Sequence, residues 1–269
     1  MLKDAPMAPG RKVVHDPSSH PHVLATKFLV SRRKPNIARI RRRLETFKDL
    51  PFNHPHVGCT RPGHINASAL GLQRSWKRIE ISADLGYGRN AYETAKIALI
   101  NWDMHKHSDW AGIYLESGNR RASGSEEVDQ RSLATLAKTF LRFIWVVNPC
   151  RTVYSILDEE CGGGSGDDHS NTLSMHSCVS YATLKGHLFE GEEMLRVIWE
   201  KPKNVENCDE NNRSNGRVIF ELLSLSQGKG LRGKIAFKLG SKMQMKFFQE
   251  QADTMVKLVQ SEGSGIIKS

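Results

Sequence analysis

The chain has 269 residues, of which 39% are hydrophobic and 25% are charged, a composition typical of a globular protein with one large domain or two small ones. Its five cysteines include no C-x-x-C pair, which argues against a disulfide framework and a structural zinc site, so we expect an intracellular, cytoplasmic protein. The longest apolar runs, such as residues 143–147, are far shorter than the roughly 20 residues of a transmembrane helix, and the N-terminus lacks a secretory signal.

The positive charge is concentrated at the N-terminus. Residues 1–48 contain 12 Lys/Arg against 3 Asp/Glu, a net charge of +9, whereas residues 49–269 contain 27 against 26, a net charge of +1. Recognition of a nucleic-acid backbone needs a basic face on the folded body, so no nucleic-acid partner is expected.

Residues 1–26 are rich in Pro, His and Ser without periodicity, and we expect a disordered arm there. Residues 27–48 combine basic clusters with apolar residues at helical spacing, namely Ile37, Ile40, Leu44 and Phe47. This basic amphipathic helix has two interpretations. It binds an anionic membrane surface or an acidic partner through residues 27–48, or it packs its apolar stripe on the body of the protein, which we favour.

Alternating apolar residues from Lys77 to Leu85 predict a half-buried strand, followed by a glycine-bearing turn and a helix from about Asn90 to His105. Asn90 and Glu93 resemble a capping box at the start of this helix. Its expected buried stripe is formed by Ala91, Ala95, Ala98 and Trp102.

Residues 86–91 match the dinucleotide fingerprint G-x-G-x-x-G/A between a strand and a helix. The strand alternates, whereas a central parallel strand is almost continuously apolar, and no series of alternating strands and helices follows. We therefore expect no nucleotide cofactor. Gly86, Gly88 and Arg89 remain a weak candidate for binding a small anion at the helix N-terminus.

Further strands are expected at Trp110–Glu116, Leu133–Val147 and Arg151–Leu157, with a break at Pro149. Two polar segments, residues 160–177 and 201–216, are expected to be flexible loops.

Another strand is expected at Arg217–Leu225, followed by a break at Gly228–Gly233. The last helix is expected from about Ser241 to Gln260, ahead of a disordered tail at 261–269. Its apolar stripe consists of Met245, Phe248, Ala252, Met255 and Val259.

The densest polar pattern lies between residues 181 and 193, Y-A-T-L-K-G-H-L-F-E-G-E-E. Residues 179–184 and 192–199 read as strands across a Lys-Gly turn, which predicts an antiparallel hairpin. Adjacent residues of a strand point to opposite faces, so we expect one of Glu192 and Glu193 to point inward, with Arg151 as its partner. The alternative is a turn histidine and two solvated glutamates.

Two of these segments resemble the DUF1990 family. P-C-R-T-V-Y-S-I-L-D-E at 149–159 is similar to its P-C-R-V-V-Y-V-V-D-E, and the hairpin segment is similar to its F-x-Y-G-T-L-P-G-H-P-E-x-G-E-E. V-G-C-T at 57–60 is similar to V-G-A-T. Departures include Ala182 for the usual Gly, and Lys185 and Leu188 for two prolines.

The resemblance covers about residues 28–260 and implies no established activity, although assignment of some plant relatives to the plastid envelope raises that location as an alternative. The order of the elements is similar to that of START-like, helix-grip proteins. We therefore expect an α+β fold in residues 27–260, in which a curved antiparallel sheet grips a long C-terminal helix and a basic helix precedes the sheet.

Our first functional hypothesis is a binding module for an apolar small molecule or lipid, held between sheet and helix, although a solid core is the simpler interpretation of the helix face. The candidate ligand-binding residues are Arg151, Tyr181, Thr183, His187, Glu192 and Glu193. The alternatives are a peripheral membrane or plastid-envelope protein, related to pores, that uses the basic helix, and an enzyme in which Glu192 or Glu193 works with His187 in acid–base chemistry.

No metal ion is expected as a cofactor. An H-x-H pair occurs three times, but each lies in an expected loop or at a helix end: His20/His22, His54/His56 and His105/His107.

Overall fold

The computed structural model describes residues 29–63, 76–106, 108–116, 131–138, 144–161, 173–201, 216–228 and 230–263. The arm expected at 1–26 lies outside these residues, as do most of the two expected loops and of the expected tail.

Eight antiparallel strands form one sheet in the order β2-β8-β7-β6-β5-β4-β3, and β1 pairs with β5 beside this path. The strands are β1 (Leu29–Ser31), β2 (Lys77–Tyr87), β3 (Ala111–Leu115), β4 (Ser132–Lys138), β5 (Trp145–Cys161), β6 (Leu173–Thr183), β7 (Phe189–Lys201) and β8 (Arg217–Gly228). The helices are α1 (Ile37–Phe47), α2 (Gly88–Asn101), the 3-10 helix η2 (Asp103–His105) and α3 (Gly230–Gly263).

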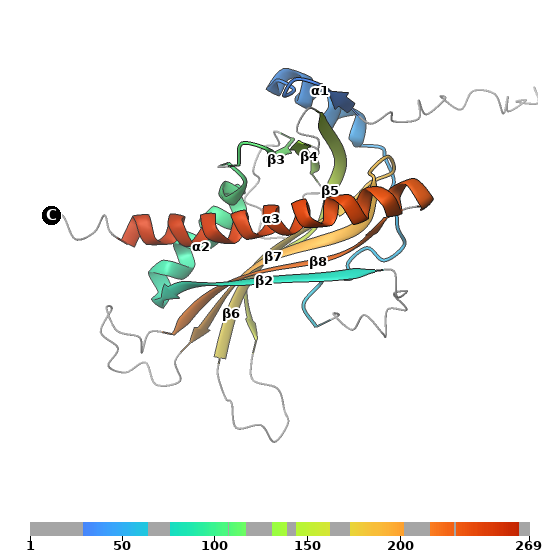
Figure 1. The fold of residues 1–269 in the computed structure, drawn as a ribbon. Coiled ribbons are helices and arrows are strands. Elements are labelled where there is room, and N and C mark those ends of the chain that lie inside the picture. The colour runs from blue at the N-terminus through green and yellow to red at the C-terminus, as the bar shows by residue number, and fades with distance from the viewer. Residues whose placement is uncertain are drawn as a thin grey trace, which may run out of the picture.

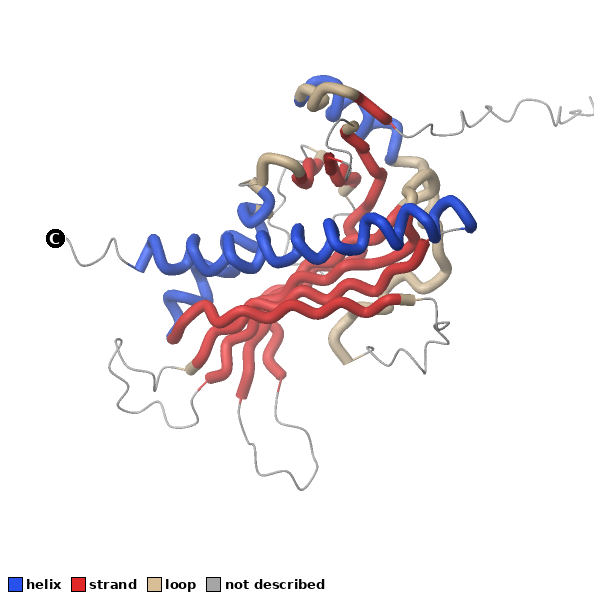
Figure 2. Tube along the Cα trace, viewed as in Figure 1, coloured by secondary structure: helices blue, strands red, loops and turns tan. Residues whose placement is uncertain are grey.

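The sheet is curved, and α3 lies across its concave side with α2 beside it (Figures 1 and 2). We call this side the inner face. The strands alternate, so that residues such as Ile79, Leu195 and Phe220 pack with α2 and α3, whereas their neighbours pack on the outer face. The expected α+β architecture, a curved antiparallel sheet gripping a long C-terminal helix, is confirmed.

Helix α1 packs against the outer face at β4 and β5. Ile40, Leu44 and Phe47 are buried with Leu136 and Trp145. The packing interpretation of the basic helix is thus confirmed for three residues of its expected stripe, whereas the fourth, Ile37, is 58% exposed. The part of the predicted helix that precedes residue 37 is wrong, because residues 29–31 pair with β5 as a short strand.

The strand expected from Lys77 is confirmed as β2, and as an edge strand of an antiparallel sheet it has no parallel partner. Helix α2 begins at Gly88 and has no side-chain cap, so the capping box of Asn90 and Glu93 is wrong. The helix ends when Trp102 adopts a left-handed conformation with φ 59°.

The break expected at Pro149 is also wrong, because β5 runs through this residue opposite Ala134 of β4. The Pro149 carbonyl accepts a hydrogen bond from the Leu184 N–H at 3.0 Å, just beyond the end of β6. In an antiparallel strand the N–H and the carbonyl of one residue point to the same neighbouring strand, so an N–H at Pro149 would also point toward Leu184. Because Leu184 lies beyond the last residue of β6, the missing N–H removes no hydrogen bond between β5 and β6.

The strand expected at 133–147 is two strands, β4 and β5, and the ends of the loop expected at 160–177 belong to β5 and β6. Helix α3 begins at Gly230 rather than Ser241, which removes most of the expected break. Its buried stripe contains Phe248, Ala252, Met255 and Val259, whereas the fifth expected member, Met245, is 39% exposed.

The contact between β7 and β8 generates the first prediction. A Cβ atom added at Gly191 would lie 2.5 Å from the Leu225 carbonyl oxygen and 2.7 Å from Ser226 Cβ. Gly191→Ala therefore forces the two strands apart, and we expect it to lower the free energy of unfolding by about 2–4 kcal/mol in a urea titration. Gly112→Ala is the control, because its nearest atom would be 3.5 Å away. Equal stability of the two variants would contradict the contact.

Candidate functional site

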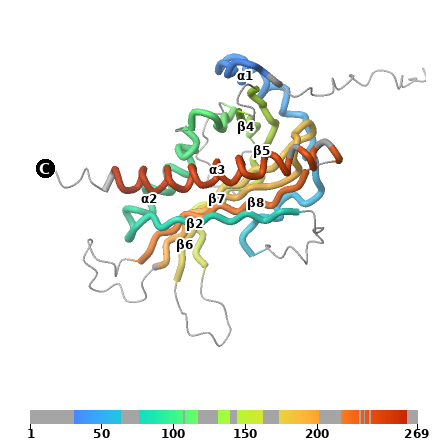
Figure 3. The backbone as a smooth tube through the Cα atoms, viewed as in Figure 1, coloured from blue at the N-terminus to red at the C-terminus, as the bar shows by residue number. Residues whose placement is uncertain are grey.

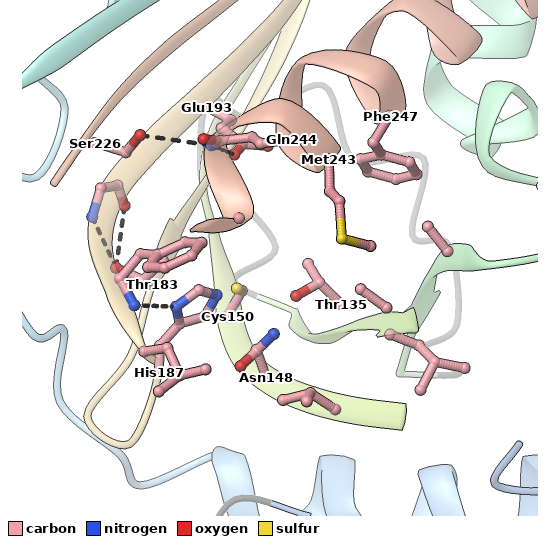
Figure 4. Close-up of a pocket in the computed structure, with 18 of the residues that line it drawn as sticks. Thr135, Asn148, Cys150, Thr183, His187, Glu193, Ser226, Met243, Gln244 and Phe247 are labelled. Carbon is pink, nitrogen blue, oxygen red and sulfur yellow. Dashed lines mark hydrogen bonds between the residues drawn. The ribbon is translucent and has the colours of Figure 1, made fainter. Parts of the chain in front are cut away.

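A cavity of about 380 Å³ lies between the inner face of the sheet and the N-terminal half of α3 (Figure 4). Its walls are mostly apolar, with Val146 of β5, Leu188 and Phe189 of the hairpin turn, and Met243 and Phe247 of α3 among them. A concave, mostly apolar volume with few polar groups is the usual form of a small-molecule site.

The alternation of the strands determines which polar side chains face this cavity. On β5, Asn148 and Cys150 point inward, and on β6 Tyr181 does so. Tyr181 is paired in register with Glu193 of β7, so these two side chains meet on the inner face. The hairpin predicted from the sequence is confirmed by this pairing.

Glu193 is the centre of a polar cluster on the cavity wall. Its carboxylate accepts hydrogen bonds from the Tyr181 hydroxyl and, at 3.3 Å, from Gln244 Nε2 of α3. Gln244 Nε2 also donates to the hydroxyls of Ser224 and Ser226, both at 3.4 Å. Burial raises the pKa of Glu193 to about 7, and the hydrogen bonds from Tyr181, Gln244 and Ser224 oppose that rise.

His187 lies at the turn of the hairpin and lines the same cavity. Its Nδ1 atom accepts the Phe189 N–H at 2.9 Å. Burial lowers the pKa of His187 to about 3, so the ring is neutral and its proton is on Nε2. Figure 4 shows the ring turned toward Cys150, which gives the cavity wall one N–H donor.

Two amide oxygens near the cavity, Asn148 Oδ1 and Gln244 Oε1, are buried and have no hydrogen-bond partner among the described residues. Cys150 is a neutral thiol, because burial raises its pKa well above the usual range. Close to Glu193, the site therefore combines one carboxyl group with neutral polar groups.

Glu192 points the other way, to the outer face, and is 1% exposed. Its carboxylate accepts the Gly58 N–H at 2.6 Å, the Thr60 N–H at 3.1 Å and the Thr60 hydroxyl at 2.5 Å. Ser180 donates a fourth bond at 3.3 Å. We call these four residues the Glu192 clamp; burial raises the pKa of Glu192 and the same hydrogen bonds lower it. The clamp joins the segment V-G-C-T to the segment G-E-E.

The family model for a domain of unknown function, DUF1990, matches residues 55–254, which include the Glu192 clamp and the whole hairpin. The chain belongs to the DUF1990 family. Two relatives have the name UPF0548 protein. The Dictyostelium discoideum protein is 22% identical over 183 residues, 68% of this chain and 72% of its own length. The Arabidopsis thaliana protein is 26% identical over 179 residues, 65% of this chain and 69% of its own length.

Solved structures also align with this DUF1990 chain. A hypothetical protein from Helicobacter pylori gives a TM-score of 0.38 at 12% identity and covers 77% of this chain and 94% of its own. Human STARD10 gives a TM-score of 0.36 at 8% identity and covers 87% of this chain and 85% of its own. Separately, none of the helices among the described residues is long and apolar enough to span a membrane.

The predicted pairing of Arg151 with Glu192 or Glu193 is wrong. Arg151 points to the outer face, where Nη2 donates to the carbonyls of Phe47 at 3.0 Å, Lys48 at 2.5 Å and Leu50 at 2.9 Å. Carbonyls at the end of a helix have no partner within it, so the guanidinium closes the end of α1 instead. In this chain, Arg151 therefore fixes α1 and is not among the residues that line the cavity.

Of the other candidates, Thr183 lines the cavity, but its hydroxyl donates to Asn53 Oδ1 at 2.6 Å and accepts the Gly191 N–H at 2.9 Å. This side chain fixes the segment after α1 to the hairpin. Tyr181, His187 and Glu193 therefore remain as the predicted polar residues that face the cavity with groups a ligand can reach.

The geometry does not support the anion site expected at Gly86, Gly88 and Arg89. The Gly88 N–H donates to the Gly216 carbonyl at 2.8 Å, and the Gly86 N–H donates to the Asp84 carboxylate at 2.9 Å. Both amides are therefore occupied by partners within the chain, and the Asp84 carboxylate is itself paired with Arg217 at 2.8 Å.

Sequence reasoning missed several residues of the site, namely Thr135, Asn148, Cys150, Ser226 and Gln244. The alternation of Val146, Asn148 and Cys150 was a usable signal for β5, but the break assigned to Pro149 concealed it. For Gln244 the sequence offered no such periodicity, because the helix was predicted to begin at Ser241, and three residues are too few to show which side of a helix faces the sheet.

The raised pKa of Glu193 generates the second prediction. Its pKa is about 7 in the folded protein and 4.5 for a free side chain, so between these pH values the native state binds more protons than the unfolded state. The contribution of Glu193 to the free energy of unfolding is therefore complete below about pH 4.5 and is lost as the pH rises through 7. We expect the loss to be on the order of 2 kcal/mol, because water in the cavity screens part of the effect.

The measurement is chemical denaturation from pH 5 to pH 8 of the unaltered protein and of Glu193→Gln. The difference between their unfolding free energies isolates Glu193 from the other titrating groups, including Glu192 and the three histidines whose pKa is lowered by burial, His105, His176 and His187. A difference that does not change with pH would show that the carboxyl group titrates normally.

Proposed function

We propose that this protein binds an apolar small molecule or lipid in the cavity between the sheet and α3. The observation that supports this function is the unfilled volume beneath α3, whose walls are mostly apolar and include the polar cluster around Glu193. The volume of about 380 Å³ falls in the lower part of the usual range for small-molecule sites, about 300–1,000 Å³.

The two halves of α3 differ in a way that favours a site over a loosely packed core. Toward its C-terminus, Ala252 and Met255 are 0% exposed and fill the space above the sheet. Toward its N-terminus, Met243 and Phe247 border the cavity instead. Methionine adapts to ligands of different shape because its side chain is unbranched and flexible.

The third prediction tests this function with 1-aminoanthracene, a small uncharged fluorophore. We expect saturable binding at one site per chain, measured by the rise in fluorescence. Ala137→Trp places an indole in the cavity, because Ala137 lines it, and should weaken binding at least tenfold. Leu157→Trp is the control, since this strand residue is 51% exposed and lies outside the cavity lining. Absence of saturable binding to the unaltered protein would overturn the proposal.

A second candidate function, association with an anionic membrane surface, is favoured by the first turns of α3. Leu231, Ile235 and Leu239 follow one another at a spacing of four residues and are 77%, 56% and 52% exposed. Residues 230–249 contain five Lys/Arg and no Asp/Glu. An exposed apolar stripe among basic side chains is the usual pattern of a helix that lies in a membrane interface.

This part of α3 also adjoins the cavity. Leu239 lines it, and Phe237 contacts Phe189 of the hairpin turn with ring centroids 5.1 Å apart. Figure 3 shows the start of α3 beside the β6–β7 turn. Helix α1, in the segment 27–48 proposed from the sequence as the membrane-binding segment, packs Ile40, Leu44 and Phe47 on the sheet. Of its expected apolar stripe, this leaves Ile37, which is 58% exposed, for contact with a membrane.

The fourth prediction uses flotation of the protein with vesicles of phosphatidylcholine and phosphatidylserine. The double variant L231Q/I235Q should reduce the bound fraction at least fivefold, because it removes the apolar contact and keeps every lysine. The control is L157Q/L173Q, which changes two leucines that are each 51% exposed on strands far from α3's first turns. Equal flotation of both variants would exclude this surface. Replacing Arg39, Arg41 and Arg42 by Glu tests the face of α1 in the same assay.

A further inference from the structure

The carboxyl group of Glu193 borders the cavity without a cation beside it. Its hydrogen bonds come from the Tyr181 hydroxyl and the Gln244 amide, which are both neutral. Among the described residues that line the cavity, Lys138 is the single Lys or Arg, and its Nζ lies over the ring of Trp145, 5.8 Å from the centroid. Trp145 packs with α1 on the outer face, so this ammonium group is directed away from Glu193.

The other groups that face the cavity near Glu193 carry no compensating charge. Cys150 of β5 is a neutral thiol, and His187 at the turn is a neutral imidazole that can donate one hydrogen bond. On α3, Gln244 directs its Nε2 to Glu193, Ser224 and Ser226, which fixes the orientation of its amide and leaves Oε1 without a donor. This wall therefore has more acceptors than donors.

We propose that the cavity selects an uncharged or cationic apolar molecule whose polar end is a hydroxyl or amine, and that it rejects carboxylates. This inference rests on the proposed function and gives the class of ligand. A hydroxyl or amine donates to Glu193 or to the unpaired Gln244 oxygen, and a hydroxyl also accepts the His187 N–H. A carboxylate would place a second negative charge near Glu193 with no cation to balance it, which is costly in an apolar space.

The fifth prediction compares three ligands with the same tail, 1-decanol, decylamine and decanoate, by isothermal titration calorimetry at pH 8. Glu193 is mostly ionised at this pH, because its pKa is about 7. We expect 1-decanol and decylamine to bind at least tenfold more tightly than decanoate. Decanoate binding as tightly as 1-decanol would overturn the inference and leave the proposed function standing.

A pair of variants shows whether Glu193 sets this preference. Glu193→Gln removes the charge, so decanoate should gain at least fivefold in affinity and decylamine should lose at least fivefold. Glu80→Gln makes the same change on β2, at a side chain that is 59% exposed and outside the cavity lining, and should leave the order of the three ligands unchanged. A merely structural role of Glu193 would weaken all three ligands together and would overturn the inference.

The same titrations separate the two proposals. Binding of 1-aminoanthracene without binding of any decyl ligand contradicts the selectivity and supports the cavity. Failure of all four molecules to bind contradicts both.

Discussion

A buried carboxylate on β7 determines how this domain is held together. Glu192 is closed off from water on the outer face, and the two N–H groups and two hydroxyls of the Glu192 clamp satisfy its oxygens. An ionised group in such a place is stable only when it is fully hydrogen-bonded, so residues 58–60 must lie where they do. The clamp thereby fixes residues 58–60 to the outer face of β6 and β7.

The clamp also decides the environment of the next residue. Since neighbouring side chains of a strand point to opposite faces, fixing Glu192 outward directs Glu193 toward α3. There it meets the hydroxyl of Tyr181 and the amide of Gln244 instead of a backbone cradle. The two adjacent glutamates thus differ in role. Glu192 is structural, because four donors satisfy its oxygens, whereas Glu193 faces the cavity and has no charged partner among the described residues.

Helix α3 connects the core to the cavity. Its C-terminal half contributes Phe248, Ala252, Met255 and Val259 to the main core, which holds the helix on the sheet. Its N-terminal half spans the cavity, and its outer side is exposed and basic. A single rigid element therefore anchors the fold, closes the proposed ligand site and presents the proposed membrane-binding stripe, so these features are not independent of one another.

Local pattern in the sequence was sufficient for the hairpin, for β2 and for the core stripe of α3, because period-2 and period-3.6 repeats record which side of an element is buried. It also predicted that Glu192 and Glu193 diverge. It did not reveal their partners. Glu192 accepts hydrogen bonds from Gly58 and Thr60, which are more than 130 positions away, and Arg151 donates to carbonyls at the end of α1. The partner of a buried polar group depends on which donors or acceptors the folded chain brings near it, and local sequence does not record this. The start of α3 was likewise decided by the fold. The glycines at 228–233 predicted a break, but they let the chain pass so close to itself that a Cβ atom at Gly228 would lie 2.3 Å from the Gly233 carbonyl oxygen, and the helix continues from there with Phe237 packed on Phe189.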